Sequence, residues 1–176
     1  GKVKQLLQDL LEQLPDDFNM VIVKRDAAEN LTQIDAPYTL LLLQELTRMN
    51  TLLSAMRTSM VELQKGLNGE LNMSEGMDHL FEALTINQVP GRNPFHRTSW
   101  EKHAWWSMKT LSQWFPELLK RHAQLLQWQE SMVMPKCMWF PGLFNPMAYL
   151  TALMQVTGRQ RGFPLDNMTT ETHITV

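Results

Sequence analysis

Histidine side chains could bind a metal ion or transfer a proton. There are five in 176 residues, and zinc ligands usually come as closely spaced His/His or His/Cys pairs. The nearest approach to such a set is His96 and His103, seven positions apart, with Glu101 between them. This spacing matches no common ligand motif, so we interpret these side chains as solvated loop residues and expect no metal site.

Nucleophiles and phosphate-binding loops give no stronger signal. A phosphate loop needs Gly-x4-Gly-Lys-Ser/Thr, whose backbone amides surround the phosphate oxygens, and no such string occurs. The single cysteine, Cys137, follows Lys136 in an apolar run, which favours a buried, unreactive thiol. Ser107 and Ser112 lack a Gly-x-Ser-x-Gly context, and helix capping explains them better. We therefore expect no catalytic residue and no cofactor in this sequence.

Aromatic residues alternate with cations between residues 92 and 115, a combination that can stack nucleic-acid bases. The net charge is -2 and the pI is about 6.2, so no broad basic surface exists to hold a phosphate backbone. A tryptophan-rich core is the better interpretation, and we expect no nucleic-acid partner. Apolar runs, such as Leu40 to Leu43, are at most four residues long and far too short to cross a bilayer, so we expect no membrane partner either. The aromatic residues concerned are Trp100, Trp105, Trp106, Trp114 and Phe115.

The longest element that the pattern predicts is a helix from about Asp35 to Leu67. Asp35 suits an N-cap, Pro37 suits a first turn, and Gly66 and Gly69 mark the end. Within it, apolar residues recur at alternating spacings of four and three, which is a heptad pattern. We call this set the seam: Leu42, Leu46, Met49, Leu53, Met56, Met60, Leu63 and Leu67.

The seam has two possible roles. It can pair with another chain in a coiled coil, as in a self-standing adaptor or scaffold module, or it can be the core face of a helix packed within one chain. Additional leucines at 40, 41, 43 and 52 widen the apolar stripe beyond a two-stranded seam, which favours the core helix. About 30 helical residues measure roughly 45 Å, more than a small domain needs, so the helix should brace something larger.

The other patterns predict a mainly α fold: a helical bundle built on one long helix, with a short extended segment and a terminal strand that begins a truncated β region. Shorter helices are expected over 2–14, within 16–34, and over 74–85, 109–130 and 145–158. In the third of these we expect Met77, Leu80, Phe81 and Leu84 to be buried, and in the last Tyr149, Leu150, Leu153 and Met154. Pro116 should bend the fourth helix or mark its first turn. The extended segment is Lys136–Phe144, and the strand is Thr170–Val176.

Several short motifs follow one another along nearly the whole sequence. The long helix carries Gln44-Glu45-Leu46 and Arg48-Met49-Asn50, and then Arg57 and Ser59. A track of Val89-Pro90, Trp100, Ser107, Leu111 and Trp114 comes next. The most specific stretch is WFPGLFNPMAYLTALMQ, residues 139–155, whose chief residues are Trp139, Gly142, Phe144, Asn145, Pro146 and Gln155. Pro164-Leu165-Asp166-x-Met168 follows it.

In this order the motifs resemble the C-terminal region of dynein heavy chains. Asn145-Pro146, Leu153-Met154-Gln155 and Pro164-Leu165-Asp166 resemble the axonemal type, and the opening LLEQLPDDFNM, residues 10–20, resembles outer-arm chains. One departure is the nine residues between Pro90 and Trp100, where the family usually has a couple.

The resemblance implies a segment of an ATP-driven microtubule motor of the ciliary or flagellar axoneme, within the cytoplasm and cytoskeleton. Residues 1–34 would close the small subdomain of the last AAA+ module, and 35–176 would be the helical portion of the C-terminal domain, with its β-barrel missing. ATP and magnesium would bind elsewhere in the parent motor. The partners implied are the rest of the AAA+ ring and, indirectly, microtubules and the dynein intermediate and light chains.

Overall fold

The computed structural model describes residues 1–91 and 100–175. His96 and most of the loop between Pro90 and Trp100 lie outside the described residues. Over the described ranges the protein forms six α-helices and two 3₁₀ turns, so the predicted mainly α class is confirmed. None of these helices is long and apolar enough to span a membrane.

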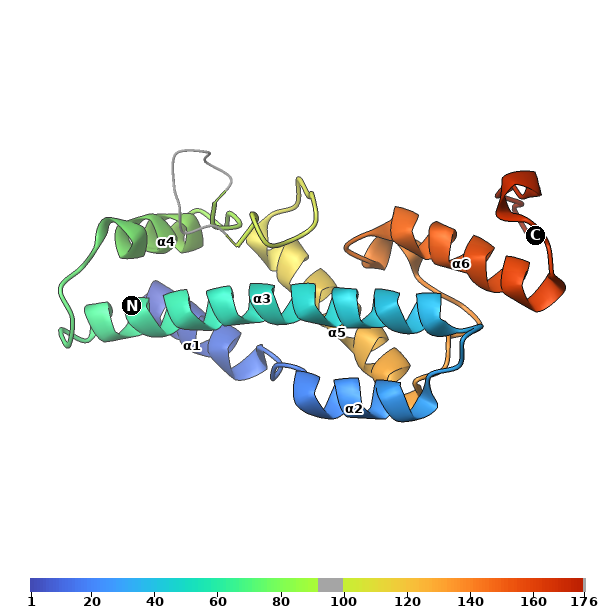
Figure 1. Ribbon diagram of the computed structural model, residues 1–176. Helices are drawn as coiled ribbons and strands as arrows, with labels where there is room; N and C mark the ends of the chain where they lie inside the picture. Colours follow the sequence, from blue (N-terminus) through green and yellow to red (C-terminus); the bar gives the residue numbers. More distant parts are fainter. Residues whose placement is uncertain (92–99, 176) are drawn as a thin grey trace. The chain divides into compact units, whose positions relative to one another are not determined.

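The elements occur in the order of the sequence and are labelled in Figure 1. The α-helices are α1 (Lys2–Gln13), α2 (Met20–Asn30), α3 (Ala36–Leu67), α4 (Glu75–Thr85), α5 (Leu111–Ser131) and α6 (Pro146–Arg161). The 3₁₀ turns are η1 (Phe140–Gly142) and η2 (Leu165–Asn167). Figure 1 shows α3, with 32 residues, as one continuous helix.

Two compact units divide the protein, and each is made from two stretches of sequence. Unit 1 comprises Gly1–Phe18 and Arg48–Ala123, and unit 2 comprises Asn19–Thr47 and Gln124–Val176. Both α3 and α5 therefore contribute residues to both units. In unit 1, α1 contacts α4, and in unit 2, α6 contacts η1 and η2.

Local signals account for where the helices begin and end. The Asn19 side chain accepts hydrogen bonds from the Val21 and Ile22 N–H groups at the start of α2, and the Ser74 hydroxyl accepts from Met77 N–H, at 3.3 Å, at the start of α4. α6 ends at Arg161, and its C-cap Gly162 has a left-handed φ of 68°, which suits a residue without Cβ. The predicted end of α6 near Gly158 is thus about one turn too early.

Gly158 has a packing role instead. A Cβ there would lie 3.2 Å from the Phe163 carbonyl oxygen and 3.3 Å from side-chain atoms of Leu165 and Met168. The missing side chain lets the segment after α6 fold back against the helix, because that return path runs directly over Gly158.

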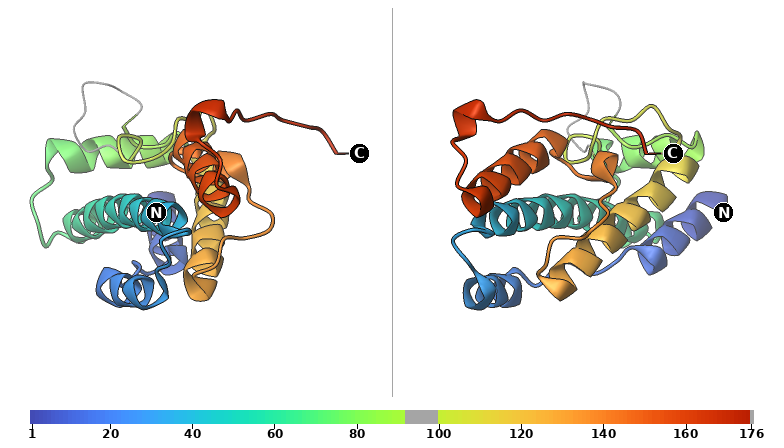
Figure 2. Two further views of the ribbon diagram at one scale, coloured as in Figure 1. Left: turned by 45° about the vertical axis from the view of Figure 1, so that its right-hand side comes forward. Right: turned by 90° about the vertical axis from the view of Figure 1, so that its right-hand side faces the viewer.

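The predicted terminal strand is wrong for the residues described. Residues 170–175 form neither helix nor strand, and Figure 2 shows the segment beyond η2 as irregular. Alternating side chains produce a strand only where a neighbouring backbone can complete the ladder, and the described residues supply none. The expected extended segment, 136–144, is irregular and contains η1.

Three expectations about single elements also change. Phe81 is 37% exposed, because the buried face of α4 is narrower than its apolar pattern. The residues of α6 with the least exposure are Ala152, Val156 and Gly158, so the four large side chains expected there are only half-buried. Pro116 does not mark the first turn of α5, because it lies further inside the helix; the expected bend stays a prediction.

Candidate functional site

The seam lies on the buried face of α3. Seven of its eight residues, Leu42 through Leu63, are at most 1% exposed, and Leu67 at the helix end is half-buried. Neighbouring Leu41 and Leu52 are buried too, whereas Leu40 is 58% exposed. The seam up to Leu63 is therefore already covered by other parts of this protein.

In unit 1, polar side chains of α3 hold the segment that joins α1 to α2. The Asn50 side chain accepts from Phe18 N–H and donates to the Phe18 carbonyl oxygen, both at 2.8 Å. Arg57 donates to the Pro15 carbonyl oxygen at 2.7 Å, and its guanidinium lies 3.7 Å from the Asp17 carboxylate. These contacts give an irregular backbone the partners that a sheet or helix would otherwise supply.

His122 on α5 completes the attachment of this segment. Its Nε2 lies 3.3 Å from the Asp16 carbonyl oxygen, and its ring stacks on Phe18 at a centroid distance of 4.6 Å. Burial lowers the pKa of His122 below its ordinary 6.5, against smaller opposing effects of the Asp16 backbone, Asp16 and Asp17. Because a carbonyl oxygen only accepts, the neutral ring with its proton on Nε2 fits this site.

Unit 1 also contains a cluster of stacked tryptophans. The ring of Trp114 stacks on Trp105, with centroids 5.0 Å apart, and on Trp100, with centroids 6.2 Å apart. The Trp100 indole N–H donates to the Ser59 hydroxyl on α3 at 2.9 Å. The expected tryptophan core thus includes these rings, but Trp106 is 84% exposed.

Arg121 covers this cluster. Its guanidinium lies 3.9 Å above the Trp105 ring and donates to the Glu117 carboxylate at 2.8 Å, and Lys109 donates to the same carboxylate. Burial raises the pKa of Glu117, but the hydrogen bonds and positive charges of Lys109 and Arg121 outweigh it and lower that pKa. Both Lys109 and Arg121 are therefore engaged within the protein.

In unit 2, the segment before α6 is held by α5 and α3. The Gln124 amide accepts from Trp139 N–H at 2.7 Å and donates to the Trp139 carbonyl oxygen at 3.2 Å. The Trp139 ring then covers Gly142, where an added Cβ would overlap the ring carbons. Glycine at this position allows the tryptophan to lie flat over the η1 turn.

Glu45 holds the next two residues. Its carboxylate accepts from Phe144 N–H at 2.7 Å and from Asn145 N–H at 2.9 Å, and the residue is only 1% exposed. A buried carboxylate needs such donors because burial without them costs several kcal/mol. Glu45 thus fixes the backbone directly before α6.

Asn145 then starts α6. Its side chain accepts from Ala148 N–H at 3.1 Å, and Pro146 takes the first helical position, where no backbone N–H is needed. Asn145 is fixed through both its backbone and its side chain. The structure therefore brings five of the six motif residues together, from Trp139 to Pro146.

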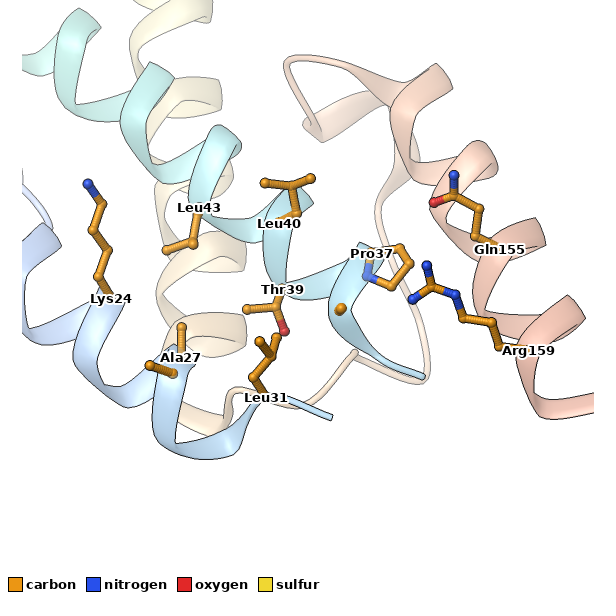
Figure 3. Close-up of a pocket in the computed structure, with 11 residues that line it drawn as sticks. Lys24, Ala27, Leu31, Pro37, Thr39, Leu40, Leu43, Gln155 and Arg159 are labelled. Atoms are coloured by element: carbon orange, nitrogen blue, oxygen red, sulfur yellow. The ribbon is translucent and has the colours of Figure 1, made fainter. Parts of the chain in front are cut away.

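Gln155, the sixth, lies elsewhere in unit 2, on an open groove of about 450 Å³. Figure 3 shows this groove with Lys24 from α2 and Gln155 and Arg159 from α6 on opposite sides of Leu31, which directly follows α2, and of two leucines from α3. We name it the α2/α3/α6 groove. Its lining is Lys24, Ala27, Ala28, Leu31, Ala36, Pro37, Thr39, Leu40, Leu43, Gln155 and Arg159.

The sequence patterns missed Glu45, Gln124 and His122. Glu45 lies three positions after Leu42 and four before Met49, so it is in register with the seam. A charged residue on an otherwise apolar helix face is a usable signal of a buried polar contact. We find no comparable signal for Gln124, which pairs with the backbone 15 residues later, or for His122, which contacts the backbone 106 residues earlier.

The histidines and Cys137 are the remaining candidate residues from the sequence. Among the described residues, no three His, Cys, Asp or Glu side chains lie close enough to hold a metal ion. Cys137 is exposed, so the expected buried thiol is wrong. The irregular backbone around Cys137 leaves its side chain at the surface, although its sequence neighbours are apolar. The contacts of Asn50, Glu45 and Gln124 define a helical packing module in which polar side chains fix irregular backbone.

Comparison with known proteins agrees with this class. The family model for the C-terminal domain of the dynein heavy chain matches residues 1–176. The flagellar outer-arm dynein beta chain of Chlamydomonas reinhardtii is 39% identical over 174 residues, which cover 99% of this protein and 4% of the relative. The outer-arm alpha chain of the same organism is 40% identical over 182 residues, 98% of this protein and 4% of that relative. Human dynein axonemal heavy chain 9 is 38% identical over 174 residues, 99% of this protein and 4% of that relative.

The protein belongs to the family of C-terminal domains of dynein heavy chains. The predicted resemblance to axonemal dyneins is therefore confirmed. The sequence spans about 4% of the length of these curated relatives.

Proposed function

We propose that this protein is a non-catalytic, structural and regulatory segment of an axonemal dynein heavy chain, and that it braces the AAA+ ring of the motor in cilia and flagella. The family match over residues 1–176 supports this proposal, and so do the matched relatives, which are named flagellar, ciliary or axonemal dynein chains. Nucleotide hydrolysis and microtubule binding belong, in this proposal, to other parts of the heavy chain. Residues 1–34 would close the last AAA+ module, and residues 35–176 would form the C-terminal domain.

The observation that carries the bracing role is the buried seam. A 32-residue helix whose apolar face is covered within the protein is a stiff element with no free seam for a partner helix. This disfavours the alternative, a self-standing coiled-coil adaptor, which needs that face for dimerisation. Sedimentation across a range of concentrations separates the two: the adaptor requires reversible dimers.

The bracing role predicts effects on the motor without effects on nucleotide affinity. Leu46 is fully buried, so Leu46→Ala in the full-length heavy chain should cost about 2–5 kcal/mol locally. We expect altered microtubule-stimulated ATPase or stepping force with nearly unchanged ATP affinity, because looser packing redistributes the conformations of the ring. Gln44→Ala, on the exposed side of the same turn, is the control. Unchanged velocity, force and stimulated turnover, despite proven local destabilisation, would contradict the proposal.

The non-catalytic part has a separate test. Calorimetric titration of the 176-residue protein with Mg-ATP should show no binding, because the sequence has no phosphate-cradling loop. Micromolar binding would contradict it.

A further inference from the structure

We propose that the α2/α3/α6 groove receives an amphipathic helix, bearing acidic residues beside its apolar anchors, from another part of the same heavy chain. This inference rests on the proposed function, in which the protein is one part of a much longer motor. It adds to that function a specific contact surface and the chemistry of its occupant.

Shape and apolar lining are the first support. The groove holds about 450 Å³, and most of its lining side chains are Ala, Leu or Pro. Leu31 is 53% exposed and Leu40 is 58% exposed, so two large apolar side chains of the lining face water. A cavity of this size and lining suits apolar anchors of a helix laid across it.

Small residues permit a close approach. Ala27, Ala28 and Ala36 line the side formed by α2 and the start of α3. Methyl side chains leave room for the larger anchors of an incoming helix. A helix presenting residues at i and i+3 or i+4 would place one anchor near Leu31 and another near Leu40.

Charge selects among apolar occupants. Lys24 and Arg159 lie at opposite sides of the groove (Figure 3), and its lining contains no Asp or Glu. Arg159 donates to the Gln33 carbonyl oxygen, which leaves most of its five N–H donors for other acceptors. Within the described ranges, neither cation makes an ion pair with a carboxylate. An occupant with carboxylates flanking its apolar anchors is therefore complementary at both sides.

The proposal names a part of the same polypeptide because the matched relatives are far longer than this sequence, which spans about 4% of them. Intramolecular docking also benefits from a high effective concentration.

The test places a photocrosslinking benzoylphenylalanine at Leu40 in the full-length heavy chain. The expected product is an intramolecular crosslink to a helix with apolar residues three or four apart and an adjacent Asp or Glu. The same probe at Met147, which is 67% exposed on α6 but outside the groove, is the control and should not reach that helix.

Charge variants sharpen the test. Lys24→Glu and Arg159→Glu should each lower the crosslink yield roughly tenfold, because like charges would then face each other, whereas Arg159→Lys should retain most of it. Both residues are exposed, so the fold should persist, and circular dichroism checks this. Crosslinks to a second copy or to a separate polypeptide, crosslinks that are insensitive to the charge reversals, or no crosslink at all would each overturn the proposal.

These outcomes are independent of motor output. If the crosslink forms as described but Leu46→Ala leaves ATPase and force unchanged, the docking surface stands and the bracing role fails. If Leu46→Ala alters motor output but no intramolecular crosslink forms, bracing stands and this docking surface is wrong.

Discussion

Units 1 and 2 hold their irregular segments in the same way but within different surroundings. In unit 1, Asn50 pairs with both backbone groups of Phe18, and in unit 2, Gln124 pairs with both backbone groups of Trp139. Unit 1 also buries several Met and Trp side chains. Unit 2 also has a buried carboxylate, Glu45, and an open groove.

This difference indicates how each unit is stabilised. The core of unit 1 contains Met49, Met56, Met60 and Met77 together with stacked tryptophans, so its stability depends on apolar packing. Unit 2 buries fewer large side chains and relies more on specific hydrogen bonds at the entry to α6. Substitutions should therefore destabilise the two units by different mechanisms.

The largest effect is expected in the apolar core of unit 1. Leu53→Asp or Met56→Asp would bury an unpaired carboxylate at a position with no exposure, at a cost of several kcal/mol. The whole free energy of unfolding of a domain is only about 5–15 kcal/mol. We expect loss of the cooperative melt of the 176-residue protein by circular dichroism. Ser54→Asp, on the exposed face of the same helix, should melt almost as the parent does. A variant that melts normally but changes from dimer to monomer would instead favour an intermolecular seam.

A smaller, local effect is expected at the polar contacts of unit 2. Glu45→Ala would remove the acceptor for Phe144 N–H and Asn145 N–H, which should cost about 1–3 kcal/mol. Hydrogen exchange should rise selectively over residues 139–148, where the backbone loses its anchor. Gln44→Ala is the exposed control. Uniform exchange changes across both units would show that the two do not differ in the proposed way.

Helix caps provide a matched pair across the units. Ser74→Ala in unit 1 and Asn145→Ala in unit 2 each remove a side-chain acceptor at a helix start, at a cost of about 1 kcal/mol. Asn145→Ser should recover most of that loss, since serine also caps. Denaturant melts measure both. The Asn145 backbone N–H also donates to Glu45, so this residue takes part in two contacts at the start of α6. A loss of stability for Asn145→Ala far smaller than that for Ser74→Ala would argue that the start of α6 contributes little to unit 2.

The last effect depends on pH and belongs to unit 1. His122 has a pKa lowered by burial, so between that pKa and 6.5 the unfolded protein binds a proton that the folded protein does not. Stability is therefore complete above pH 6.5 and falls as the pH drops below it. His122→Gln keeps a donor for the Asp16 carbonyl oxygen but does not titrate. The melting temperature should fall more between pH 7.5 and pH 5.5 for the parent than for this variant. Equal falls would contradict the assignment of this pH dependence to His122.

Most helices follow from local signals in the sequence. The long helix is predicted from about Asp35 to Leu67 and is found at Ala36–Leu67, and the Asn145-Pro146 start of α6 is found as expected. Errors arise where one residue decides an end, as at Gly162 rather than Gly158, or where a pattern needs a partner, as at residues 170–175.

The helical class, the family and the apolar face of α3 can all be read from the order of the amino acids, since periodicity, caps and motif order are properties of neighbouring residues. Only the tertiary structure shows that Glu45 anchors the backbone before α6, that Cys137 is exposed, and that Lys24 and Arg159 flank one groove. Those facts join positions about a hundred or more residues apart in the sequence, or depend on which atoms cover a side chain. No local pattern encodes such contacts, because backbone groups available to a distant side chain exist only once the protein is folded.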